Sequence, residues 1–145
     1  MDRELHVVYA SDDRFAEILG VSLTSLYENN KGMDAINIYV LCNKISDVNK
    51  EMLESISRTY GRSSICWIPA KDISKELQME DAVDRGSSSQ YARLFVSSVL
   101  PENLKRVLYL DCDTIIIHPL DELWNIDMQG KTIAALKDVL VHGIG

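Results

Sequence analysis

Short apolar runs alternate with helical patterns along the chain, and this alternation restricts the fold more than any other feature. Apolar residues recur at helical spacing over 15–30 and again between Ser46 and Gly61. Runs rich in β-branched and aromatic residues predict strands at 5–10, 36–42, 65–68 and 107–110. Since amphipathic helices between strands make right-handed crossovers, we expect an α/β fold with a mostly parallel sheet and helices on both faces.

The remaining segments carry weaker patterns. Residues 71–89 have no sustained period and end in Gly-Ser-Ser-Ser, which predicts a long loop, whereas residues 90–100 return to helical spacing. One helical turn is expected at 120–124 and a further strand at 132–136. With no repeat and no linker, residues 1–145 are expected to form one domain, incomplete at its C-terminus because 139–145 begin an element without a capping sequence.

Composition excludes some classes of partner. The chain has 145 residues, 46% of them hydrophobic, and a net charge of -7, which argues against binding to nucleic acid or to an anionic membrane. Its three cysteines have no Cys-x-x-Cys spacing, so reduced thiols are expected. No window reaches the ~18 apolar residues of a transmembrane segment. We therefore expect a cytoplasmic protein.

Acidic residues follow two of the predicted strands. Asp12 and Asp13 come after the first, and Asp111 and Asp113 come after the fourth. Ligands of open parallel sheets bind outside the carboxyl ends of the strands, so four carboxylates would converge if these strands are neighbours. A divalent cation removes the repulsion, and an Asp-x-Asp pair suits Mg²⁺ or Mn²⁺ shared with phosphates. In a strand, residues i and i+2 point to one side, so both carboxylates are expected to reach one ion.

Three other interpretations stay open from the residues alone. Asp111 and Asp113 fit a solvated strand end with helix-capping aspartates, and Asp12 and Asp13 fit an N-cap and a first-turn acid of the helix that follows. An Asp-x-Asp pair also begins the motif of haloacid-dehalogenase-type phosphatases. Asp111 would then be the nucleophile and Asp113 the general acid, although Ile115 stands where that motif has Thr or Val. An inactive, truncated domain that acts through assembly with a partner is the third interpretation.

Several motifs in fixed order resemble one enzyme family. Ala-Ser-Asp-Asp at 10–13, Tyr-Ala-Arg-Leu at 91–94, the run RVLYLDCDT at 106–114 and LDELW at 120–124 are similar to the N-terminal, nucleotide-sugar half of family 8 retaining glycosyltransferases. That family includes bacterial lipopolysaccharide galactosyltransferases and glycogenin. The resemblance implies a GT-A fold, a UDP-sugar donor, Mn²⁺ or Mg²⁺, and a glycan or lipid-linked acceptor at the inner face of the membrane. It leaves a homo-oligomer open.

The resemblance also implies roles for residues near the acidic pair. Asp111 and Asp113 would be metal ligands, and Asp113 would bridge to the diphosphate. Cys112, between them, is grouped with the donor-binding residues. Arg93 of the Tyr-Ala-Arg-Leu motif would neutralise donor charge or hold Asp111 in place, a role that suits bidentate arginine geometry.

Other roles fall on the first strand and near the C-terminus. The backbone of Ala10 and the side chain of Asp12 would hold the uracil and ribose. Arg14 stands where the family often has an uncharged residue, so its contact to the nucleoside is not carried over. Asp138 falls where the family contacts the transferred sugar or the acceptor, and it is the candidate catalytic residue.

One family ligand has no counterpart in this chain. The family takes a third metal ligand from a His in the motif H-x-x-G-x-x-K-P-W, whereas His142 here begins only H-x-x-G and is interpreted as a loop residue. The 145-residue chain is therefore expected to bind UDP and metal weakly and to transfer little sugar.

Overall fold

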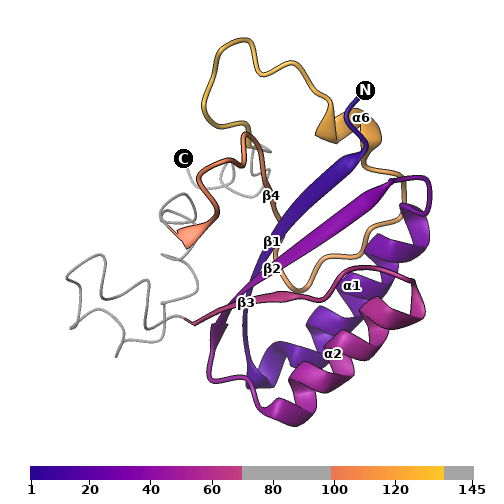
Figure 1. Cartoon of the computed structure of the whole chain (residues 1–145), viewed down its shortest axis with the longest axis vertical. Helices are drawn as coiled ribbons and strands as arrows, with labels where there is room; N and C mark the ends of the chain where they lie inside the picture. Colours follow the sequence, from indigo (N-terminus) through magenta and orange to yellow (C-terminus); the bar gives the residue numbers. More distant parts are fainter. Residues whose placement is uncertain (70–98, 136–145) are drawn as a thin grey trace, which may run out of the picture.

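The fold is built on a four-stranded parallel sheet (Figure 1). The computed structural model describes residues 1–69 and 99–135. The strand order is β3-β2-β1-β4, and the bounds are Glu4–Asp12 for β1, Ala35–Asn43 for β2, Cys66–Pro69 for β3 and Leu108–Tyr109 for β4. Neighbouring strands all run parallel, which confirms the predicted fold class.

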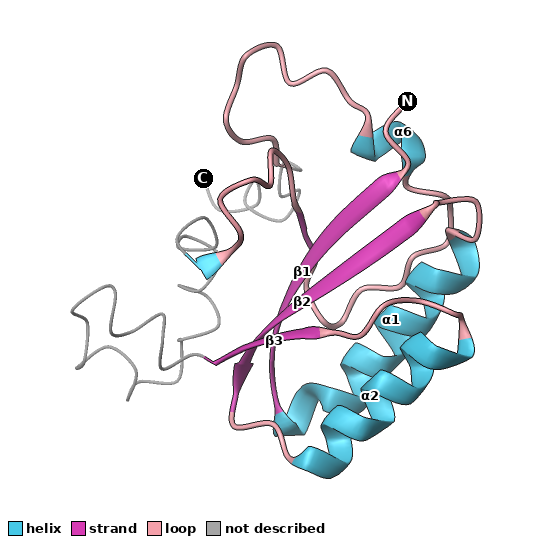
Figure 2. Ribbon diagram, in the orientation of Figure 1, coloured by secondary structure: helices cyan, strands magenta, loops and turns pink. Residues whose placement is uncertain are grey.

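Two helices cover one face of this sheet. Helix α1 (Ala16–Asn29) follows β1 through a short 3-10 turn, η1 (Asp13–Phe15), and α2 (Asp47–Thr59) follows β2. Figure 2 shows the two helices side by side on the same side of the strands. The predicted cap of α2 is confirmed, because Ser46 Oγ accepts from Asn49 N at 3.3 Å. Gly61 ends the helix region with a φ of 63°, a conformation that favours glycine.

Apolar side chains fill both sides of the central strands. Toward the helices, Leu5, Val7 and Tyr9 of β1 pack in one buried cluster with residues of α1 and α2. On the other face, Val8 and Tyr39 pack with Leu100, from the segment 99–107. This burial on both faces explains the continuous apolar runs of β1 and β2. The helix expected at 90–100 lies outside the described residues except for its last two positions.

The later part of the chain differs from the prediction. The strand predicted at 107–110 is shorter, because only Leu108 and Tyr109 pair with β1. The expected helical turn is present as α6 (Asp121–Trp124). The strand predicted at 132–136 is wrong for 132–135, which have no regular structure, and Ile133 is 79% exposed. A β-branched run forms a strand only where a partner strand and a buried face are available.

Asp13 joins the end of β1 to the start of α2. Its Oδ1 accepts hydrogen bonds from Ser46 N and from Asn49 Nδ2, both at 2.8 Å. The backbone hydrogen bond from Ser46, followed by the side-chain bond from Asn49, lowers the pKa of Asp13 below its ordinary value of 3.8. The ionised carboxylate therefore stabilises the fold above this pH.

None of the helices within 1–69 and 99–135 has the length and apolar character needed to cross a bilayer.

Replacing Leu53 by Ala tests the packing of α2 on the sheet. Leu53 is fully buried, so Leu53→Ala should lower the free energy of unfolding by about 2–5 kcal/mol in urea denaturation. Val48→Ala, in the same helix but at a position 79% exposed, should change it by less than about 0.5 kcal/mol. Equal losses from both variants would contradict the packing described.

Replacing Asp13 by Asn tests the link between β1 and α2. A carboxylate whose pKa is depressed in the folded state stabilises above its unfolded value, and this contribution is lost as the pH falls through the folded value. The stability difference between wild type and Asp13→Asn should therefore be largest near neutral pH and should shrink as the pH drops below 3.8. Asn49→Ala, which removes one donor, should reduce this pH dependence. A difference that is constant with pH would contradict the role of Asp13.

Candidate functional site

The carboxyl end of β4 lies against β1, as the prediction of a shared edge requires. Val8 pairs with Tyr109, and Leu110 N donates to Val8 O at 3.0 Å. One step further, Cys112 Sγ donates to Ala10 O at 2.7 Å. These contacts bring the acidic pair of 111–113 next to the end of β1, where Ala10 and the following acids lie.

The acidic pair lies in a turn and not in a strand. Thr114 N donates to Asp111 O at 3.3 Å, and Thr114 Oγ1 donates to the same oxygen at 2.7 Å. Cys112 and Asp113 are the central residues of this turn. The prediction that strand geometry aims both carboxylates to one side is therefore wrong, because strand alternation ends at Tyr109. The relative direction of Asp111 and Asp113 is set by the turn.

The carboxylates of this turn have the properties of hard metal ligands. Asp111 and Asp113 are both exposed, and neither side chain has a hydrogen bond or ion pair to the described residues. Cys112 between them is half-buried and directed at Ala10. Burial, with smaller contributions from the two carboxylates, raises the pKa of the Cys112 thiol, so sulfur stays protonated. Two oxygen ligands without thiolate fit Mg²⁺ or Mn²⁺ completed by substrate phosphates.

The acids at the end of β1 both accept hydrogen bonds. Asp12 Oδ1 accepts from Arg14 N at 3.0 Å and from Phe15 N at 3.2 Å, while Oδ2 pairs with the Arg14 guanidinium at 3.0 Å. Asp13 is held by α2. This confirms Asp12 as an N-cap, whereas Asp13, the acid in the first turn, bonds across to α2 and does not cap the helix that follows it. Across 1–69 and 99–135 no group of three or more His, Cys, Asp or Glu side chains is placed to hold a metal, so the expected convergence of four carboxylates is wrong.

Three residues of the predicted site lie outside the described residues. Arg93, with the Tyr-Ala-Arg-Leu motif, lies outside the described residues. So do Asp138, the candidate catalytic residue, and His142. Their roles stay predictions.

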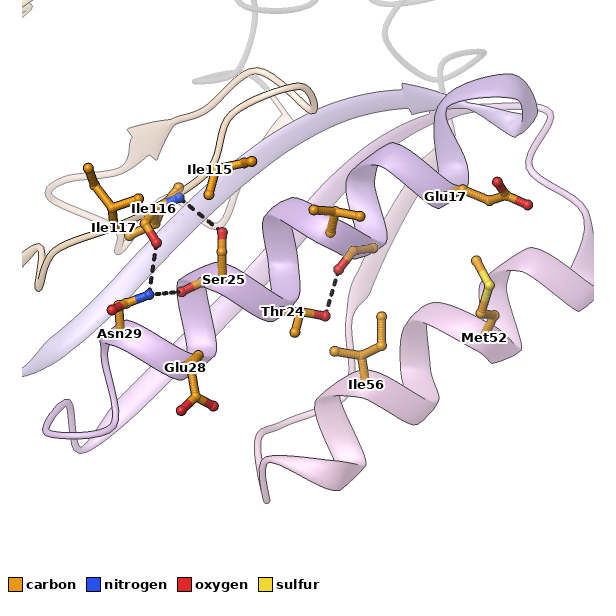
Figure 3. A pocket seen from close by; sticks show the side chains of 12 residues that line it. Glu17, Thr24, Ser25, Glu28, Asn29, Met52, Ile56, Ile115, Ile116 and Ile117 are labelled. Carbon is orange, nitrogen blue, oxygen red and sulfur yellow. Dashed lines mark hydrogen bonds between the residues drawn. The ribbon is translucent and has the colours of Figure 1, made fainter.

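A hollow in the described part of the chain lies away from this turn, on the helical face, between α1, α2 and residues 115–117 (Figure 3). Its walls are mostly apolar and include Val21, Met52 and Ile56. The charged side chains that line it are Glu17 and Glu28, which would repel a diphosphate. We therefore place the candidate site at the turn that follows β4.

The hydroxyl groups that lie beneath this turn were not predicted as part of the site from the sequence. Ser22 Oγ lies 3.3 Å from Thr114 Oγ1 and 3.0 Å from the hydroxyl of Tyr9. The signal available was weak: Ser22 falls between Leu19 and Leu23 in the apolar stripe of α1, and a serine there is ordinary.

The sequence matches a known family and several of its relatives. Residues 6–143 match the family described as Glycosyl transferase family 8. General stress protein A of Bacillus subtilis is 28% identical over 145 residues, 97% of this chain and 49% of the relative. Lipopolysaccharide 1,2-glucosyltransferase of Escherichia coli is 28% identical over 136 residues, 93% of this chain and 39% of the relative. The chain thus spans less than half the length of these two relatives.

Solved structures lead to the same family. The apo structure of the bifunctional glycosyltransferase WbbM has a TM-score of 0.72 at 26% identity, covering 88% of this chain and 22% of that one. The galactosyltransferase LgtC, solved with donor and acceptor sugar analogues, has a TM-score of 0.67 at 27% identity, covering 85% of this chain and 43% of that one. The expected GT-A fold is confirmed. Together with the match over nearly all of its length, this shows that the chain belongs to glycosyltransferase family 8.

Proposed function

We propose that this chain supplies the donor site of a metal-dependent hexosyltransferase. The reaction moves a hexose from a UDP-sugar to a glycan or lipopolysaccharide acceptor, with retention of anomeric configuration as the family resemblance implies. The observation that carries the proposal is the exposed carboxylate pair of Asp111 and Asp113, without described partners, at the carboxyl edge of a parallel sheet in a family 8 chain.

The chemistry follows from where charge develops. Breaking the sugar-phosphate bond leaves negative charge on UDP, and a bound Mn²⁺ or Mg²⁺ supplies the compensating positive charge. In this proposal Asp111 and Asp113 hold that ion, and Asp113 also faces the diphosphate. Because the chain has a net charge of -7, an anionic donor gains little from the overall field and depends on these local contacts.

Other residues bind the donor around this pair. Ala10 and Asp12, at the end of β1, hold the uracil and ribose in the proposed complex, and Cys112 supports the turn between the two ligands. Arg93 compensates diphosphate charge or orients Asp111, and Asp138 contacts the transferred sugar or the acceptor.

The acceptor and location are proposed on weaker support. One relative is a lipopolysaccharide 1,2-glucosyltransferase, and LgtC was solved with an acceptor sugar analogue, so a glycan or lipid-linked acceptor fits. Cys42, Cys66 and Cys112 form no disulfide with one another, as in proteins of reducing compartments, which supports a cytoplasmic reaction at the inner face of the membrane. The family match leaves the phosphatase interpretation without support.

Calorimetric titration with UDP tests the carboxylate pair. Binding of UDP to the wild-type chain should release heat only when Mn²⁺ is present, because the diphosphate binds through the shared ion. Asp111→Asn and Asp113→Asn should each weaken Mn²⁺-dependent binding by at least about tenfold, since even the outer partners of metal ligands contribute about 10- to 100-fold. Asp34→Asn removes the same charge beside the start of β2 and should bind like wild type.

Two outcomes would contradict this assignment. Equal heats of UDP binding with and without Mn²⁺ would separate the nucleotide from the metal. Turnover of p-nitrophenyl phosphate by wild type, abolished in Asp111→Asn, would favour the phosphatase instead.

A further inference from the structure

Polar side chains on one side of α1 hold the segment that follows the acidic turn. Ser25 Oγ accepts from Ile116 N at 2.9 Å, and Asn29 Nδ2 donates to Ile116 O at 2.8 Å (Figure 3). One turn earlier on the helix, Ser22 Oγ lies 3.3 Å from Thr114 Oγ1. Since this segment pairs with no described strand, its position depends on the side chains of the helix.

The hydroxyl groups form a chain with one direction. A hydroxyl has a single proton, and Thr114 gives its proton to Asp111 O at 2.7 Å. Thr114 therefore accepts from Ser22, whose proton is used in that bond. Ser22 in turn accepts from the hydroxyl of Tyr9, 3.0 Å away. We name this series, from Tyr9 through Ser22 and Thr114 to the carbonyl of Asp111, the hydroxyl relay.

The inner part of the hydroxyl relay is shielded from water. Tyr9 and Ser22 both have 0% exposure. Burial raises the pKa of the Tyr9 phenol above its ordinary value, so this group stays protonated and able to donate. A buried hydroxyl that loses its partner finds no water to replace it, which makes the relay sensitive to the loss of any member.

The relay ends on the backbone of a proposed metal ligand. The carbonyl of Asp111 receives both Thr114 Oγ1 and Thr114 N. Fixing this oxygen holds the peptide plane between Asp111 and Cys112, which restricts ψ of Asp111 and so the direction in which the Asp111 side chain leaves the turn. Groups that orient metal ligands in this way alter metal affinity without contacting the ion.

On the basis of the proposed function, we propose that Ser22 and Thr114 are positioning residues for the metal and diphosphate site. They act through the carbonyl of Asp111, from the buried side of the turn. Ser25 makes a comparable hydrogen bond from the same helix, but to Ile116, beyond the turn, and its own proton goes to the backbone oxygen of Ser22, outside the relay.

Binding of Mn²⁺ to variants of the whole chain tests this role. Free Mn²⁺ is measured by electron paramagnetic resonance with and without UDP, at a temperature where circular dichroism shows each variant folded. Thr114→Val keeps the shape of the side chain and removes the hydroxyl, and Ser22→Ala breaks the middle link. Each should weaken Mn²⁺ binding in the presence of UDP by about 10- to 100-fold.

Two further variants are the controls. Thr114→Ser retains the hydroxyl and should restore Mn²⁺ affinity close to that of wild type. Ser25→Ala loses one bond to the same segment and should lower the melting temperature while Mn²⁺ affinity stays near that of wild type. Equal losses of Mn²⁺ affinity in Ser22→Ala and Ser25→Ala, or wild-type affinity in Thr114→Val, would overturn the proposal.

The remaining outcomes are also decisive. A wild-type chain without Mn²⁺-dependent UDP binding overturns the proposed function itself, before any variant is compared. Should Thr114→Val fail to fold, Tyr9→Phe removes only the first donor of the relay and keeps the ring. A fall in Mn²⁺ affinity in Tyr9→Phe supports the relay, and unchanged affinity overturns it.

Discussion

The pairing of β1 with β4 is the contact on which the rest of the site depends. It consists of two residue pairs, Val7 with Leu108 and Val8 with Tyr109. The burial of β1 on both faces makes this strand a fixed reference, since its apolar side chains cannot shift without opening the core. The pairing with β1 therefore sets the position of the described residues from Leu110 onward, and the acidic turn is the first of these.

Beyond this pairing, side-chain hydrogen bonds hold the chain in place of strand pairing. Cys112 binds Ala10, and polar residues of α1 bind the hydroxyl of Thr114 and the backbone of Ile116. Helix α1 therefore has two functions on neighbouring faces, since its leucines fill the core and its serines and Asn29 support the site. Such small polar residues are weak helix formers, and their cost is offset by the hydrogen bonds that they make to the segment.

Local signals in the sequence were enough for the first two βα units. The pattern at 36–42 lies within β2, and Ser46 caps α2 as predicted, because both depend on neighbouring residues. The end of β4 was missed because strand ends are set by pairing, which composition does not show. The hydrogen bond between Ser22 and Thr114 joins residues 92 positions apart, and neither residue type indicates such a distant partner in the sequence.

The short pairing of β4 separates the stability of the sheet from the shape of the site. The exposed residues of 110–117, such as Asp111, Asp113 and Ile115, take part neither in the two pairs of β4 with β1 nor in the nine residue pairs between β1 and β2. A lineage with this architecture can therefore change its ligand preference at these exposed positions while the sheet stays the same.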